Sequence, residues 1–224
     1  MNFVSLEKLP FSVIHQAFLY AFSDYAVKME MSEQELMNRL TRIAYKPKLS
    51  GGVLVDQTLC AFILTGLGQF QGKLTAYNGG TGVIPTHRRQ QLGTKVYQAL
   101  LELYRAQDVE QCLLEVITDN DKAVKLYKSL GFRVSRVFKC YALNEKLEKE
   151  TVDVPLQISQ AESIDLTKYV PFCTTQPSWQ NMMEAVLRDL NQEIILEAYS
   201  KTTLVGFISF NPVNGKLSQL AVAP

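Results

Sequence analysis

The chain has 224 residues, of which 47% are hydrophobic and 20% are charged, the usual balance of a soluble globular protein with a sizeable core. Its 23 basic and 22 acidic residues give a net charge of +1, which argues against a nucleic-acid binder or a polybasic membrane-surface protein. The sequence shows no signal peptide and no apolar run of membrane-spanning length, so we expect a cytoplasmic protein.

The cysteine pattern agrees with a reducing compartment. The four cysteines form no C-x-x-C pair and lie mostly in apolar, strand-like runs: Cys60, Cys112, Cys140 and Cys173. Such cysteines are typically buried reduced thiols. We expect no metal site.

Two helices are predicted near the start of the chain. Residues Phe11–Phe22 are apolar nearly all round, which predicts a helix buried on more than one side. Ser32 is followed three residues later by Glu35, a capping-box pattern that predicts a second helix ending near Ile43.

Three strands are predicted next. Leu49–Val55 and Leu59–Leu64 form a hairpin with a short turn between them, and a third strand covers Leu74–Ile84. The third strand contains Asn78-Gly79-Gly80 in its middle. Two glycines are costly there unless the backbone bends or is closely approached, so the alternatives are a bulged strand and a plain loop.

The middle of the chain reads as strand, loop, helix, strand and helix. The second strand is expected at Cys112–Ile117, and the second helix from Asn120 or Asp121 to Gly131. The apolar residues of the first helix recur at spacings of four, four and three: Leu92, Val96, Leu100 and Leu103. This order predicts two neighbouring parallel strands.

The loop before the first of these helices carries the clearest chemical signal. Arg88 and Arg89 precede a helix N-terminus, whose free N–H groups and dipole favour an anion. An ordinary solvated turn is the alternative. Neither a nucleoside-triphosphate loop nor a dinucleotide fingerprint is present, because their glycine patterns are missing.

The second part of the chain repeats the first. After a predicted strand at Val134–Leu143 comes a charged linker. Beyond it, Val205-Gly206-Phe207-Ile208 aligns with Cys60-Ala61-Phe62-Ile63. In the same way, Gly215-Lys216-Leu217 aligns with Gly72-Lys73-Leu74, and Val222-Ala223-Pro224 aligns with Val83-Ile84-Pro85.

From this repeat we predict a domain over residues 1–143, a linker over 144–154 and a partial second domain over 155–224. The second domain is expected to lack a phosphate-binding loop. A simple C-terminal strand pair with a helix is the alternative.

Two motifs in the middle of the chain resemble the GNAT superfamily of acyl-CoA-dependent N-acyltransferases. The first is the family's Arg/Gln-x-x-Gly-x-Gly/Ala, matched by Arg88 and Gly93 but with Gln91 at the middle glycine. The second is an asparagine followed by A-x-x-x-Y-x-x-x-G-F. That motif is complete at Asn120, Ala123, Tyr127, Gly131 and Phe132. The resemblance covers about Leu49 to Leu143.

The resemblance implies an α/β fold (α+β by some schemes). This fold has a mixed, mostly antiparallel sheet with a central parallel pair, helices on both faces, and here a partial second GNAT-like unit. It also implies acetyl-CoA as cosubstrate. The implied CoA-binding residues are Val83, Ile84, Arg88, Arg89, Gln90, Gln91, Leu92, Gly93, Thr94 and Asn120.

The resemblance also suggests catalytic roles. Tyr127 is expected to protonate the departing CoA thiolate as a general acid, and Asn120 to bond the pantetheine amide. The general base is left open between Glu115, Tyr25 and a water held by Asn78 and Tyr77. Tyr25, Tyr77 and Asn78 are expected near the acceptor.

Two functions are compatible with these residues. The favoured one is an acetyl-CoA-dependent N-acetyltransferase acting on a small-molecule amine, as a monomer or homodimer, with no nucleic-acid or membrane partner. The alternative is a non-catalytic acyl-CoA-binding or sensing protein with the same fold. The departure at Gln91 and the missing base would allow that alternative.

Overall fold

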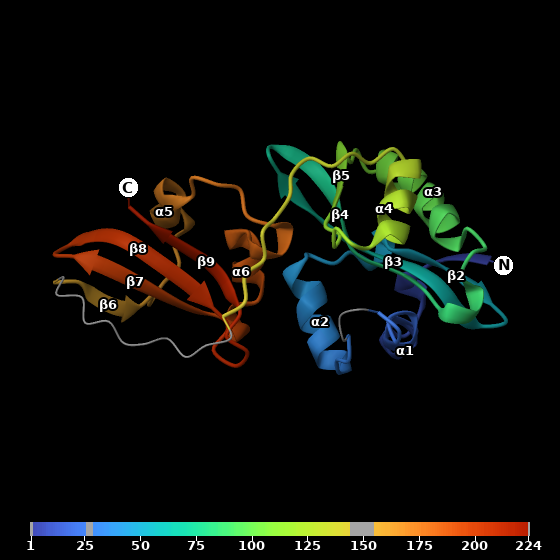
Figure 1. The fold of residues 1–224 in the computed structure, drawn as a ribbon, viewed down its shortest axis with the longest axis horizontal. Coiled ribbons are helices and arrows are strands. Elements are labelled where there is room, and N and C mark those ends of the chain that lie inside the picture. Colours follow the sequence, from blue (N-terminus) through green and yellow to red (C-terminus); the bar gives the residue numbers. More distant parts are fainter. Residues whose placement is uncertain (1, 26–28, 144–154, 224) are drawn as a thin grey trace. The chain divides into compact units, whose positions relative to one another are not determined.

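A computed structural model describes residues 2–25, 29–143 and 155–223. The chain forms two compact units, each built on its own sheet (Figure 1). The first unit contains Met1–Leu126 and Pro177–Asn191, and the second contains Tyr127–Gln176 and Gln192–Pro224. The unit boundaries therefore differ from the predicted domain boundaries, and the predicted linker at 144–154 lies outside the described residues.

The sheet of the first unit is mixed, with the strand order β1-β2-β3-β4-β5. Neighbouring strands are antiparallel except β4 and β5, which are parallel. This confirms the predicted fold class. The strands are β1 (Asn2–Ser5), β2 (Gly51–Val55), β3 (Thr58–Phe70), β4 (Lys73–Val83) and β5 (Gln111–Leu114).

Helices cover both faces of this sheet, with α1 and α2 on one face and α3 and α4 on the other (Figure 1). They are α1 (Phe11–Ala21), α2 (Glu33–Arg42), α3 (Leu92–Arg105) and α4 (Asp121–Ser129). The capping box predicted at Ser32 and Glu35 is present. Short 3-10 turns join these elements: η1 (Leu6–Lys8), η2 (Pro47–Leu49) and η3 (Pro85–His87).

Two glycines let the chain after α2 approach the sheet closely. A Cβ atom at Gly66 would lie 2.0 Å from the carbonyl oxygen of Ile43, and one at Gly79 would lie 2.2 Å from the Cδ1 atom of the same residue. Glycine is therefore needed at Gly66, because the clashing atom belongs to the backbone.

The second unit has a four-stranded antiparallel sheet in the order β6-β7-β8-β9. Its strands are β6 (Gln157–Gln160), β7 (Ile194–Ser200), β8 (Thr203–Phe210) and β9 (Leu217–Val222). Short helices complete its part of the chain: α5 (Leu166–Tyr169), η4 (Val170–Phe172) and η6 (Leu190–Gln192). Between them, η5 (Trp179–Asn181) and α6 (Met183–Arg188) belong to the first unit.

The second sheet repeats the first in strand order and in register. Both hairpins have a bulge at the same place, between Val53 and Leu54 in β2 and between Ala198 and Tyr199 in β7. A second bulge interrupts both β3–β4 and β8–β9, after Leu64 and after Ser209. Because both bulges recur at equivalent positions, the structure supports the repeat independently of the sequence match.

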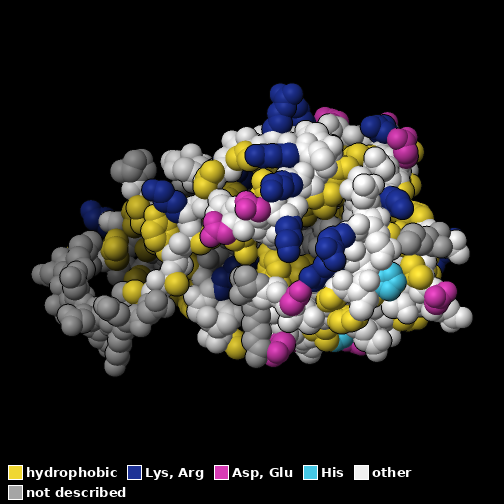
Figure 2. All heavy atoms as spheres, turned by 45° about the vertical axis from the view of Figure 1, so that its right-hand side comes forward, with side chains coloured by type: hydrophobic (Ala, Val, Ile, Leu, Met, Phe, Trp, Pro, Cys, Tyr) yellow, Lys and Arg dark blue, Asp and Glu magenta, His cyan; other side chains and the backbone are white. Residues whose placement is uncertain are grey.

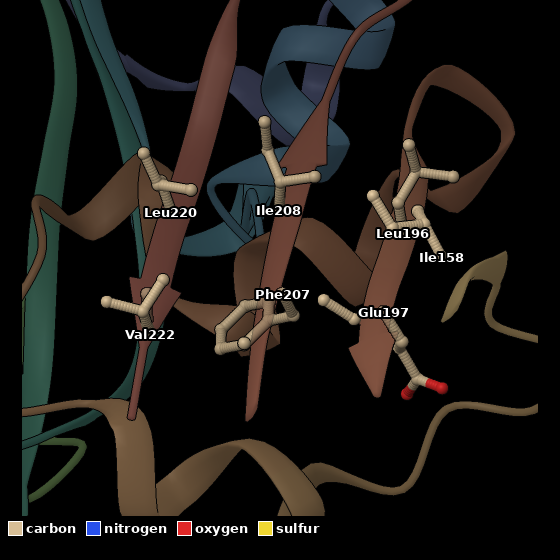
Figure 3. Close-up of a pocket in the computed structure, with 10 residues that line it drawn as sticks. Ile158, Leu196, Glu197, Phe207, Ile208, Leu220 and Val222 are labelled. Carbon is tan, nitrogen blue, oxygen red and sulfur yellow. The ribbon is translucent and has the colours of Figure 1, made fainter. Parts of the chain in front are cut away.

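One face of the second sheet is apolar and exposed (Figure 3). Leu196, Ile208 and Leu220 lie side by side across β7, β8 and β9. Leu220 is 64% exposed and Val222 is 70% exposed.

Two sequence predictions need correction, and one strand was missed. Val134–Leu143 forms no strand, and its apolar side chains are largely exposed, because a β-favouring sequence becomes a strand only where it pairs with an edge. Cys140 and Cys173 are exposed rather than buried. Strand β1 was not predicted, since four residues carry too little periodicity.

Within residues 2–25, 29–143 and 155–223, none of the helices has the length and apolar character needed to cross a bilayer.

Candidate active site

The central feature of the first unit is the point where β4 and β5 separate. The two strands pair from Thr75↔Gln111 to Asn78↔Leu114, and β4 then continues to Val83. Gly79 is the extra residue of the β3–β4 bulge and follows Asn78 directly. The bend predicted from the paired glycines is therefore confirmed, and it lies where the parallel pair ends.

Asn78 stabilises this bulge. Its side chain is buried, its amide nitrogen donates to Thr81 Oγ1 at 2.8 Å, and its carbonyl oxygen accepts the Gly80 N–H at 3.0 Å. The amide thus bridges the Thr81 hydroxyl and the Gly80 backbone. A role for Asn78 in holding a water remains a prediction.

The loop after β4 leads directly into the start of α3. Lys95 N–H donates to the Gln91 carbonyl as the first helical bond, so the N–H groups of Leu92, Gly93 and Thr94 precede the hydrogen-bond ladder. A Cβ atom at Gly93 would lie 3.4 Å from Leu126 of α4. The helix start therefore offers N–H groups and a positive dipole end to an anion.

Arg88 is tied to α1 and the turn after it. Its guanidinium donates two hydrogen bonds to the Asp24 carboxylate, at 2.6 and 2.7 Å, and one to the Ala21 carbonyl at 3.0 Å. Its Nε donates to the Val83 carbonyl at 3.2 Å. The hydrogen bond from Arg88 lowers the pKa of Asp24. Arg88 therefore holds the loop against α1 in this structure.

Other basic side chains surround the same loop. Arg89 is exposed and lies at a φ of +62°. Lys122, in the first turn of α4, is close enough to Asp24 to contribute to the lowering of its pKa. Figure 2 shows Lys and Arg side chains gathered on one face of the molecule with apolar side chains between them. Sequence reasoning missed Lys122, although the spacing from Lys122 to Lys125 places both on one side of α4.

Asn120 joins the start of α4 to the aromatic residues after α1. Its side-chain oxygen accepts the Ala123 N–H at 3.2 Å, which caps the helix, and its amide nitrogen donates to the Tyr25 hydroxyl at 3.3 Å. Tyr25 packs edge-on against Phe22, with ring centroids 5.4 Å apart. The structure thus brings together Asn120 and Tyr25, two residues predicted for different roles.

A second polar group lies at the end of β5. Glu115 accepts the Trp179 N–H at 2.8 Å on one carboxylate oxygen and the Tyr77 hydroxyl at 3.3 Å on the other. Burial, followed by the charge of Glu115, raises the pKa of Tyr77 far above its usual value. Tyr77 therefore stays protonated and acts as a donor. Nothing in the sequence pattern indicated Trp179.

Comparison with known proteins decides the family. The model of the acetyltransferase (GNAT) family matches residues 16–132, more than half of the chain. This chain belongs to the GNAT acetyltransferase family. The search of curated proteins found no match.

Solved structures show the same fold. A putative acetyltransferase from Pyrococcus furiosus matches with a TM-score of 0.52 at 17% identity, over 63% of this chain and 99% of that one. A chain of the NatC complex bound to Gag peptide and CoA matches with a TM-score of 0.50 at 18% identity, over 62% and 89%. An aminoglycoside acetyltransferase from an uncultured soil metagenomic sample, in complex with sisomicin, matches with a TM-score of 0.49 at 17% identity, over 64% and 95%.

The departure from the GNAT motif at Gln91 has a structural meaning. Gln91 is the N-cap of α3 and has a φ of +58°, in the left-handed region that glycine enters without penalty. A residue with a side chain thus adopts here a backbone conformation that favours glycine. The backbone N–H groups at the start of α3 are still present for an anion.

Tyr127 of the GNAT signature lies on α4 and is half-buried. Its ring packs edge-on against Phe132, with centroids 5.8 Å apart, and its carbonyl oxygen accepts the Phe132 N–H at 3.0 Å. Gly131, at a φ of +91°, allows the chain to turn back in this way after α4. The predicted end of this helix is confirmed.

Proposed function

We propose that this GNAT protein is an N-acetyltransferase that moves the acetyl group of acetyl-CoA to a primary amine of a small molecule by direct attack. The observation that carries the proposal is the separation of β4 from β5 after Asn78, beside the N-terminus of α3. A gap between parallel strands offers unpaired backbone groups to the pantetheine arm. The adjoining helix start offers N–H groups to the pyrophosphate.

The residues of the first unit fit acetyl-CoA. Backbone groups from Val83 to Thr94 line the loop, and Arg89 and Lys122 supply positive charge for phosphates. Asn120 is proposed to bond the pantetheine amide. In the structure its amide nitrogen donates to Tyr25, and that contact would be exchanged or shared when the substrate binds. No residue of this set requires a metal.

The proposed reaction has one bond formed and one broken. The amine nitrogen attacks the thioester carbonyl, a C–N bond forms, and the C–S bond breaks as the tetrahedral intermediate collapses. The proton lost by the amine passes to a base, and the departing CoA sulfur takes a proton from Tyr127, which then recovers one from solvent.

We assign the base to Glu115. Of the alternatives, Tyr25 is bonded to Asn120, the residue proposed to bond the pantetheine amide. The Asn78 amide, which would hold a water together with Tyr77, is engaged by Thr81 and Gly80. Glu115 is a carboxylate with two donors that fix its orientation, and it lies at the end of β5, where the strands part. A carboxylate can accept the amine proton directly or through one water.

The chain is proposed as a tandem repeat, with a domain at 1–143, a linker at 144–154 and a partial second domain at 155–224, of which Pro177–Asn191 packs with the first unit. Its support is the shared register and the two shared bulges of the sheets. We place the enzyme in the cytoplasm because its four cysteines are free, which is typical of a reducing compartment.

Isothermal titration with acetyl-CoA tests the proposal, combined with an assay of free thiol release on a panel of amines. We expect one CoA per chain, bound by the first unit, and amine-dependent thiol release. A stoichiometry of two per chain, or no binding, contradicts the assignment of the site. Tight binding without turnover on any amine favours an acyl-CoA sensor instead.

A further inference from the structure

A segment from late in the chain completes the first unit. Pro177–Asn191 packs with residues that precede it in sequence by 64 to 146 positions. Trp179 is fully buried there, and its ring stacks on Tyr77 of β4 with centroids 5.0 Å apart and planes 2° from parallel. Its indole Nε1–H donates to the Ile43 carbonyl at 3.1 Å.

This segment is anchored by charged side chains as well as by the indole. Arg42 Nε donates to the Gln180 carbonyl at 2.6 Å, and Arg188 Nε donates to the Arg42 carbonyl at 3.1 Å. Arg42 also lies 3.6 Å from the Asp189 carboxylate, with both side chains largely buried. These contacts to the end of α2 fix the segment at Gln180 and at the end of α6.

The anchored segment reaches the Glu115 carboxylate by two routes. The Trp179 N–H donates directly to one oxygen at 2.8 Å. The Gln180 amide nitrogen donates to the Tyr77 hydroxyl at 3.1 Å, and Tyr77 donates to the other oxygen at 3.3 Å. Because an amide NH₂ group cannot accept a hydrogen bond, the Tyr77 hydroxyl keeps its own hydrogen for Glu115.

We infer that Trp179 and Gln180 are positioning residues for acetyl transfer in the first unit, because they orient Glu115 directly and through Tyr77. The inference rests on the proposed function, in which Glu115 accepts the amine proton. It adds that the acceptor side of the active site is built by a segment of the chain's second half. The residues matched by the family, 16–132, would then be incomplete without Pro177–Asn191.

The physical consequence is a loss of rate without a loss of CoA binding. The two donated hydrogen bonds hold the Glu115 carboxylate in one orientation, so removing a donor lets it leave the position from which it accepts the amine proton. Such a change lowers kcat and leaves the affinity for acetyl-CoA unchanged. Lost packing alone would lower the melting temperature and leave kcat unchanged.

The test compares full-length variants in the thiol-release assay at a single pH. Tyr77→Phe removes the direct donor and should lower kcat by about tenfold. Gln180→Met keeps the length of the side chain but not its donor, and should lower kcat by a smaller factor, because it acts through Tyr77. In both variants the Kd for acetyl-CoA should stay unchanged.

Trp179→Ala should lower kcat further, because the indole no longer holds the backbone N–H beside Glu115. Should that variant fail to fold, Gln180→Met still decides the question. Glu184→Gln, on an exposed side chain of the same segment, is the matched control and should behave as the parent.

The experiment distinguishes failure of the proposed function from failure of the positioning role. Absence of turnover in the parent on every amine removes the proposed function and the inference together. Turnover in the parent, with an unchanged kcat in Gln180→Met and Tyr77→Phe, overturns only the positioning role.

Discussion

The two sheets have the same backbone plan but different surroundings at their bulges. In the first sheet the extra residue is Gly79, and β4 leaves β5 beside it. In the second sheet the extra residue is Ser218, whose hydroxyl donates to the buried Glu193 carboxylate at 2.8 Å. Ser209 donates to the other oxygen of Glu193 at the same distance. One bulge thus borders a gap between strands, and the other is closed by a polar cluster.

The outer faces of the two sheets differ as well. Gly51 of β2 lies under Leu100 of α3, since a Cβ atom there would be 3.2 Å from that side chain. The register places Leu196 of β7 at the equivalent position, where it belongs to the exposed apolar face of Figure 3. The proposed cofactor site therefore depends on more than a bulged hairpin. The parallel strand and the helix start beside the first bulge supply the groups that a CoA molecule would need.

The largest expected effect concerns the proposed general acid, Tyr127. Tyr127→Phe keeps the ring packing on Phe132 and removes only the hydroxyl. Kcat should fall by about 10²–10⁴-fold, the usual contribution of a general acid, with little change in CoA affinity or melting temperature. Tyr141→Phe, at a side chain that is 87% exposed, is the control and should leave the rate unchanged. An unchanged rate in Tyr127→Phe would show that Tyr127 contributes packing and is not the general acid.

The next effect separates the two arginines of the loop. Arg89→Ala should weaken CoA binding by roughly tenfold or more and reduce its salt sensitivity, because a charge-assisted bond is typically worth ~1.5–3 kcal/mol. Arg105→Ala, at the other end of α3, is the control, since its guanidinium pairs with Glu102. Wild-type affinity in Arg89→Ala would exclude its side chain from phosphate binding.

Arg88 calls for a different experiment, because its guanidinium is bonded to Asp24. We expect Arg88→Ala and Asp24→Asn to weaken CoA binding to a similar degree and without additivity, since both release the loop from α1. If Asp24→Asn instead tightens binding, Arg88 leaves the aspartate and contacts a phosphate in the complex.

For the polar cluster of the second sheet, formed by Glu193, Ser209 and Ser218, we expect an effect on stability and none on CoA binding. Ser218→Ala leaves one buried oxygen of Glu193 without this donor and should lower the free energy of unfolding by about 1–3 kcal/mol. CoA affinity and turnover should stay at the level of the parent, because the cluster belongs to the second unit. Chemical denaturation and titration of the same preparation measure both. Loss of CoA binding would show that the second bulge serves the site after all.

Local patterns in the sequence predicted most of the first unit. The capping box at Ser32, the strand bend at Gly79 and the helix end at Gly131 each depend on a few neighbouring residues, so they could be read directly. The docking of Trp179 on Tyr77 could not, because it joins segments about one hundred residues apart with no shared periodicity. The pairing of Arg88 with Asp24 was missed for the same reason, and the motif pointed to phosphate instead.

The smallest expected effect tests the one departure from the family motif. Gln91→Gly restores glycine at a φ of +58°, where a side chain costs about 1–2 kcal/mol relative to glycine. Part of that gain is offset, because glycine is more flexible in the unfolded chain. We therefore expect the net stability to rise by no more than about 1 kcal/mol, and CoA affinity to rise by a few-fold if the side chain crowds the pyrophosphate.

Gly72→Ala, at a φ of +74° in the β3–β4 turn, is the reverse control and should lower stability without changing CoA affinity. Weaker CoA binding in Gln91→Gly would mean that the glutamine side chain itself contacts the cosubstrate, so that the departure from glycine serves binding.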